Sequence, residues 1–267
     1  MKLADIVTTE YGTINGNVQE EIICEKDSAV GILLDAFDTY QEWKQQAHSL
    51  QTDICSYIIQ DKMPKPYSVK DIETVSNILG NLSSGKGSFS NTAGVFLTKL
   101  ILMHKIRNQT SQDLAHPPLY KINTTKFAKN IFSYIPYFGR NMSFTNIEVT
   151  GDLGEEAFGF SENCNFVVYG STHSETGKNM KNCSLIIKGN TRNFVGREIK
   201  NSNIVVEGDA LDGVGNCMHS GEIIIYGNAG KNVGLNAYGG IITLFGDYES
   251  LAPYTKAQIY HKGERIR

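Results

Sequence analysis

Glycine recurs every 19 residues along the second half of the chain, and this period limits the fold more than any other feature of the sequence. The anchor glycines of the repeat are Gly151, Gly170, Gly189, Gly208, Gly227 and Gly246. A second glycine follows seven residues after four of these anchors, at Gly177, Gly196, Gly215 and Gly234. In the first copy we expect Gly159 to take this place after a slip of one residue. A unit of this length is too short for a strand, a helix and two connections, but it fits one coil of a β-solenoid.

Each unit ends with a short apolar segment that predicts a β-strand. The first large apolar residue of this segment should line the interior of the solenoid, and Ile147 begins the same segment one unit earlier. These interior positions are Phe166, Leu185, Ile204, Ile223 and Ile242. Glycine is expected at the corners of the coil, because a left-handed φ or a close backbone approach excludes a Cβ atom. Coils about 4.8 Å apart would exchange backbone hydrogen bonds, which agrees with the lack of proline between Pro136 and Pro253.

The first half of the chain has a mainly helical pattern. Residues 5–25 alternate around an Asn-Gly pair and predict a β-hairpin. Apolar residues at helical spacing then predict helices over residues 28–48, 50–60, 68–80 and 92–107. The third of these starts at a capping box, Ser68 to Asp71, and Gly80 is its expected end.

These two patterns together predict an α+β protein in two parts. Residues 1–140 form a mainly helical domain with an N-terminal β-hairpin. Residues 141–267 form a right-handed, single-stranded β-helix with coils of 19 residues. The open strand edges of the terminal coils need a cover, which we expect from the helical domain at one end and from residues 248–260 at the other.

Composition excludes several classes of protein. The chain has 25 Lys and Arg against 28 Asp and Glu, so it lacks the basic excess of a protein that binds mainly phosphate backbone. Its five cysteines form no Cys-x-x-Cys pair, and their odd number does not fit a secreted disulfide framework. The first ten residues show no apolar targeting segment. We therefore expect a soluble, cytoplasmic protein without a membrane segment.

No constellation in the sequence predicts a catalytic, cofactor or metal site. His173 and His219 fall at different positions of the repeat, so they do not form a ladder of metal ligands. Cys164 and Cys183 fall at equivalent positions, and Ser202 follows in the next unit. A corner that requires small residues accounts for these three side chains without redox chemistry. We therefore predict no catalytic residue, no cofactor and no metal.

Residues 114–147 contain no acidic residue and mix basic with aromatic side chains. The candidate interaction residues in and around this stretch are Lys121, Lys126, Lys129 and Arg140. Such a mixture can bind single-stranded nucleic acid, because rings stack on bases and cations follow phosphates. The density of cations is modest, however, and a cap that buries its rings over the first coil is the favoured interpretation.

The repeat resembles a known family, the GXGXG repeat domain, and three segments carry the resemblance: residues 189–196, 208–215 and 227–234. Residues 218–227 and 259–266 are also similar to that family, so that the resemblance covers about Ile147 to Ile266. The domain forms the C-terminal part of the large subunit of glutamate synthase and most of one non-catalytic subunit of formylmethanofuran dehydrogenase. The resemblance implies a right-handed β-helix that braces catalytic partners and has no reaction centre of its own.

The sequence therefore favours a non-catalytic structural or interaction protein whose β-helix presents a scaffold to a protein partner or complex. Whether the chain also forms a homo-oligomer stays open. The alternative is an accessory subunit of an oxidoreductase similar to formylmethanofuran dehydrogenase or glutamate synthase. Nucleic-acid binding through residues 114–147 is a lesser alternative.

Overall fold

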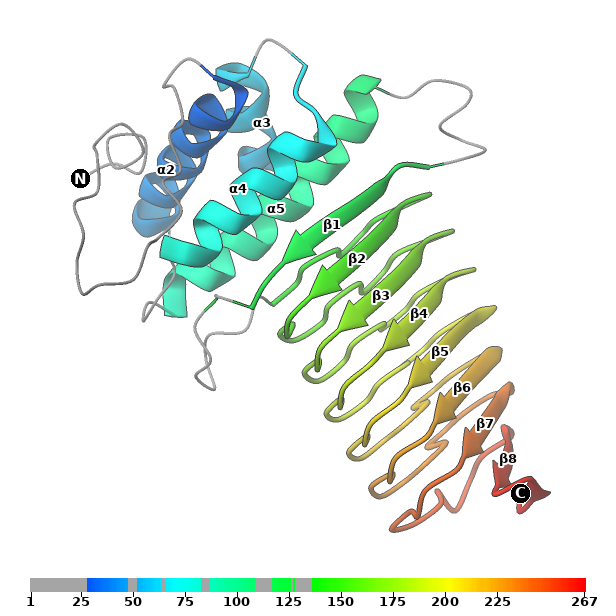
Figure 1. The fold of residues 1–267 in the computed structure, drawn as a ribbon. Coiled ribbons are helices and arrows are strands. Elements are labelled where there is room, and N and C mark those ends of the chain that lie inside the picture. Colours follow the sequence, from blue (N-terminus) through cyan, green and yellow to red (C-terminus); the bar gives the residue numbers. More distant parts are fainter. Residues whose placement is uncertain are drawn as a thin grey trace.

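The computed structural model describes residues 28–47, 52–63, 66–82, 87–108, 117–125, 127 and 136–267. Helices occupy the first part of the chain and a β-solenoid the second, as the sequence predicts (Figure 1). The predicted hairpin over residues 5–25 lies outside the described residues, as do Lys126 and Lys129. None of the described helices is both long and apolar enough to cross a membrane.

The helices of the described residues are α2 (Ala29–Ala47), α3 (Thr52–Lys62), α4 (Val69–Leu82) and α5 (Gly87–Asn108). The predicted capping box opens α4: the Asp71 N–H donates to Ser68 Oγ (3.2 Å), and the Ser68 N–H donates to Asp71 Oδ2 (2.7 Å). The expected end of this helix at Gly80 is wrong, because α4 continues to Leu82. A glycine inside a helix costs only about 1 kcal/mol, and the buried Ile78 and Leu79 hold this turn in the core.

A single sheet runs the length of the solenoid. Its strands are β1 (Leu119–Asn123), β2 (Asn146–Thr150), β3 (Asn165–Tyr169), β4 (Ser184–Ile187), β5 (Ser202–Val206), β6 (Gly221–Ile225), β7 (Ile241–Leu244), β8 (Gln258–His261) and β9 (Glu264–Arg265). Their order in the sheet is their order in the chain, and β1 to β8 pair in parallel. From β2 to β7 the partners lie 19 residues apart, as Phe166 and Leu185 do. The last coil is shorter, because Ile241 pairs with Gln258.

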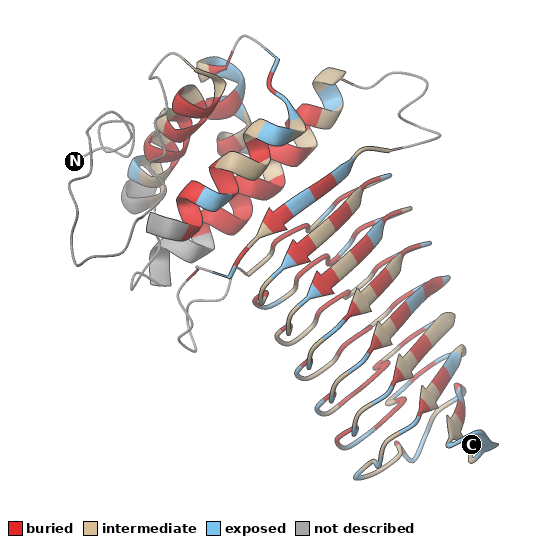
Figure 2. Ribbon diagram, viewed as in Figure 1, coloured by how far each residue is buried: buried red, intermediate tan, exposed pale blue. Residues whose placement is uncertain are grey.

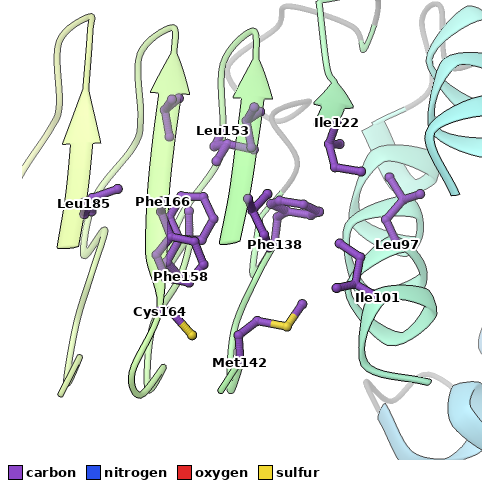
Figure 3. Close-up of a cluster of buried hydrophobic side chains, with 14 of the residues drawn as sticks. Leu97, Ile101, Ile122, Phe138, Met142, Leu153, Phe158, Cys164, Phe166 and Leu185 are labelled. Atoms are coloured by element: carbon purple, nitrogen blue, oxygen red, sulfur yellow. The ribbon is translucent and has the colours of Figure 1, made fainter. Parts of the chain in front are cut away.

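Side chains alternate between the interior and the outer side of the sheet, as the bands along the arrows in Figure 2 show. All five predicted interior residues are at most 1% exposed, which confirms their assignment. Tyr120, Ile147 and Ile259 extend this interior ladder at its two ends. The core continues into the helices, where Leu97 and Ile101 of α5 lie beside the first coils (Figure 3).

Helices α4 and α5 cover the β1 end of the sheet. The Lys121 N–H at the free edge of β1 donates to Glu73 Oε1 (3.2 Å), and Ser76 Oγ donates to the Asn123 carbonyl (3.2 Å). Strand β1 is therefore the first strand of the sheet and is itself covered, although it lies in the basic and aromatic stretch that was expected to form the cover. The sheet begins before residue 141, and the division of the chain at residue 140 stays a prediction.

The anchor glycines are required by a close approach between coils. A Cβ atom on Gly170 would lie 2.3 Å from the Gly151 carbonyl oxygen, and one on Gly246 would lie 2.3 Å from that of Gly227. The second glycines have a different role, because they adopt left-handed backbone angles, with φ of +71° at Gly177 and +73° at Gly234.

The expected slip to Gly159 in the first copy is wrong. The 19-residue register is kept, and Phe158 adopts the left-handed conformation at this position (φ 59°). Its ring is fully buried and stacks on Phe166, with ring centroids 4.1 Å apart. Packing of the large ring compensates for the strained backbone, which a pattern based on glycine could not show.

The substitution Gly170→Ala is expected to destabilise the solenoid by about 2–3 kcal/mol, because the new methyl group overlaps backbone that cannot move aside. Gly159→Ala is the matched control, since its Cβ would meet no atom closer than 3.2 Å. Chemical denaturation of both variants measures the difference. Equal stability of the two would contradict the close approach.

Candidate interaction surface

The two described residues of the predicted basic set are already paired with carboxylates. Lys121 lies on β1, with Nζ 3.9 Å from Glu148 Oε2. Arg140 lies in a turn of the next coil, with Nη1 3.3 Å from Glu156 Oε2 and its guanidinium 4.6 Å from the centre of the Phe160 ring. Lys121 and Arg140 occupy different positions of the repeat, so the structure does not join them into one basic patch.

Arg140 instead begins a ladder of charges that links four coils. The ladder contains Arg140, Glu156, Lys178, Glu175, Arg197 and Glu198. Lys178 Nζ lies 2.6 Å from Glu175 Oε2, and Arg197 Nη1 lies 2.7 Å from Glu175 Oε1. Burial tends to raise the pKa of Glu175, but the hydrogen bonds from Lys178 and Arg197 outweigh burial and lower it. The charges on this side of the solenoid are therefore satisfied within the chain.

Thiols and hydroxyls form a second, buried ladder. Cys164 Sγ donates to the Glu162 carbonyl (3.2 Å), and Cys183 Sγ donates to the Lys181 carbonyl (3.1 Å). Ser202 Oγ makes the same bond one coil later, at 3.0 Å. The hydrogen bond with Cys183 and burial both raise the pKa of the Cys164 thiol, which keeps it protonated as a donor. Each of these side chains therefore satisfies a corner carbonyl.

A third ladder, missed in the sequence, follows the anchor glycines. Each side-chain oxygen accepts the backbone N–H of the equivalent residue one coil later, at 2.6–3.1 Å. The acceptors are Asp152, Ser171, Asn190, Asp209 and Asn228. The signal was present in the sequence, since Asp, Asn or Ser follows every anchor glycine.

The outer side of the sheet carries a different set of side chains. Its middle row is apolar and consists of Val167, Ile186, Val205 and Ile224, which are partly exposed. The row two residues later consists of Tyr169, Lys188, Glu207, Tyr226 and Phe245. We call these two rows the outer strip. None of the described helices lies over β2 to β8 in Figure 1.

The second row of the outer strip is ordered and well exposed. Tyr169, Tyr226 and Phe245 are 50%, 51% and 45% exposed. The rings of Tyr226 and Phe245 stack with centroids 4.8 Å apart and planes 7° from parallel. Between the tyrosines, Lys188 and Glu207 form an ion pair, and the hydrogen bond from Glu207 raises the pKa of Lys188. A contiguous apolar and aromatic surface of this kind is typical of an interaction site.

In the described part of the chain, no three His, Cys, Asp or Glu side chains are placed to hold a metal ion together. Comparisons with protein-family models, curated proteins and solved structures find no match to this chain. The resemblance to the GXGXG repeat domain therefore stays a prediction.

Replacing Glu175 tests the charge ladder through its pH dependence. The folded-state pKa of Glu175 lies below its ordinary value of 4.5, so its stabilising effect is present above that value and is lost as the pH falls through the folded pKa. We expect Glu175→Gln to lower the thermal midpoint by about 2–4 °C at pH 7, and the gap from the unmodified chain should close below the ordinary pKa.

Glu249→Gln is the control for this measurement, because Glu249 pairs with Lys231 at 3.6 Å where both side chains are about 60% exposed. Its thermal midpoint should stay near that of the unmodified chain at either pH. A gap for Glu175→Gln that does not change with pH would rule out the ionic origin of the effect.

Proposed function

We propose that this chain is a non-catalytic interaction protein whose β-solenoid presents the outer strip to a protein partner. The observation that carries the proposal is the contiguous row of Val167, Ile186, Val205 and Ile224 beside three exposed rings. Burial of apolar surface is the main driving force of protein association, and aromatic residues are enriched in protein interfaces.

The construction of the solenoid supports this role. Backbone hydrogen bonds join each coil to the next, for example from the Lys188 N–H to the Val168 carbonyl at 2.9 Å. The outer strip is therefore held in place before a partner arrives, and binding costs little ordering of the backbone.

The chemistry of the outer strip favours a protein over a nucleic acid. Its one cation, Lys188, is already paired with Glu207. Binding of a phosphate backbone relies on several unpaired cations and gives affinity that depends steeply on salt. A role as an accessory subunit of an enzyme similar to glutamate synthase or formylmethanofuran dehydrogenase is a prediction from the resemblance alone, and it would use the same kind of surface.

Site-specific photocrosslinking in cells that naturally contain the chain tests the proposal. A benzophenone amino acid at position 205 is expected to give a discrete protein adduct, because this position is at the centre of the outer strip. The same group at position 231, where Lys231 is 61% exposed, is the control. Absence of any adduct from position 205, or equal adducts from both positions, would refute the outer strip as the interaction surface.

A further inference from the structure

We propose that the partner bound by the outer strip is a second copy of this chain. The two sheets pack face to face about a twofold axis that runs parallel to the strands, between β4 and β5. This inference rests on the proposed function, since it identifies the partner of the same surface.

The second row of the outer strip is self-complementary about this axis. Along the solenoid the row reads Tyr169, Lys188, Glu207 and Tyr226 at successive coils. The twofold rotation reverses the order of the coils but keeps the position along each strand. It therefore places Lys188 opposite Glu207 of the second copy and Tyr169 opposite Tyr226 of the second copy.

The neighbouring rows match about the same axis. In the apolar row, Ile186 meets Val205 and Val167 meets Ile224, so apolar groups face apolar groups. In the row on the other side, Asn165 faces Glu222, and a side-chain amide can donate to that carboxylate. No like charges face each other in these rows.

Charge also fixes the register between the two copies. With the axis between β4 and β5, the two Lys188 and two Glu207 side chains alternate in sign, and every charge has an opposite neighbour in its own chain and another in the second copy. An axis on β4 would place Lys188 opposite its own equivalent, and an axis on β5 would do the same for Glu207. Opposed like charges cost several kcal/mol in an interface, so these registers are disfavoured.

The size of the face suits a dimer. The proposed axis passes through the middle of the eight parallel strands, so that the whole sheet overlaps. Eight strands about 4.8 Å apart and five residues long give about 600 Å² of flat area per chain. The two faces together reach about 1,200 Å², which is the lower end of standard stable interfaces.

Analytical ultracentrifugation of the full chain with charge-exchange variants tests the dimer. The unmodified chain is expected to sediment as a dimer at micromolar concentration. Lys188→Glu places two carboxylates opposite Glu207 and is expected to weaken the dimer about tenfold or more. The double variant Lys188→Glu/Glu207→Lys restores both the pair within each chain and the pair between chains, so the dimer should return. Lys231→Glu, outside the outer strip, is the control and should leave the dimer intact.

Rescue by the double variant separates a lost interface from a misfolded chain, and circular dichroism of each variant checks the fold directly. A monomer at all concentrations, or a dimer that Lys188→Glu leaves unchanged, would overturn the inference. A monomeric chain that still gives an adduct of another protein from position 205 would also overturn it, while the proposed interaction function would stand.

Discussion

The structure depends on one repeated interaction, the backbone hydrogen bonds that each coil donates to its neighbour. From β2 to β7 these bonds join residues 19 apart, so each coil must repeat the path of the one before it. The close approach that results leaves no room for a Cβ atom at Gly170 or Gly246. It also accounts for the scarcity of proline, which has no N–H to donate. Glycine content and proline scarcity are thus two consequences of one constraint.

The same register turns every position of the repeat into a ladder. Inside the solenoid the ladders are apolar or satisfy backbone groups, as with Cys164 and its neighbours. Outside, one side carries paired charges around Glu175, while the outer strip carries apolar and aromatic groups. Stacking at coil spacing makes each surface continuous, and the order of residues along a ladder then gives it direction. The pseudo-symmetric order about Lys188 and Glu207 is the basis of the proposed dimer.

Regular backbone geometry explains which features the sequence could predict. The interior residues from Phe166 to Ile242 were predictable, because one position per coil always faces inward. Phe158 at a left-handed position was not, since its buried ring compensates for a strain that no local pattern records. Strand β1 was missed because it lies 27 residues before its partner, as Tyr120 and Ile147 show, and so stands outside the period. The outer strip has no motif, and only the register brings its residues together.

The central claim is that one coil of 19 residues is the unit of the fold, and removal of one unit tests it most directly. Deleting residues 189–207 joins Lys188 to Gly208 and lets β4 pair with β6 in the same register. Amide hydrogen exchange should then show protected strands on both sides of the junction. Deleting residues 198–207 removes a strand but leaves part of a coil, and protection should be lost around the junction. Equal protection in both variants, or its loss in the first, would contradict the account.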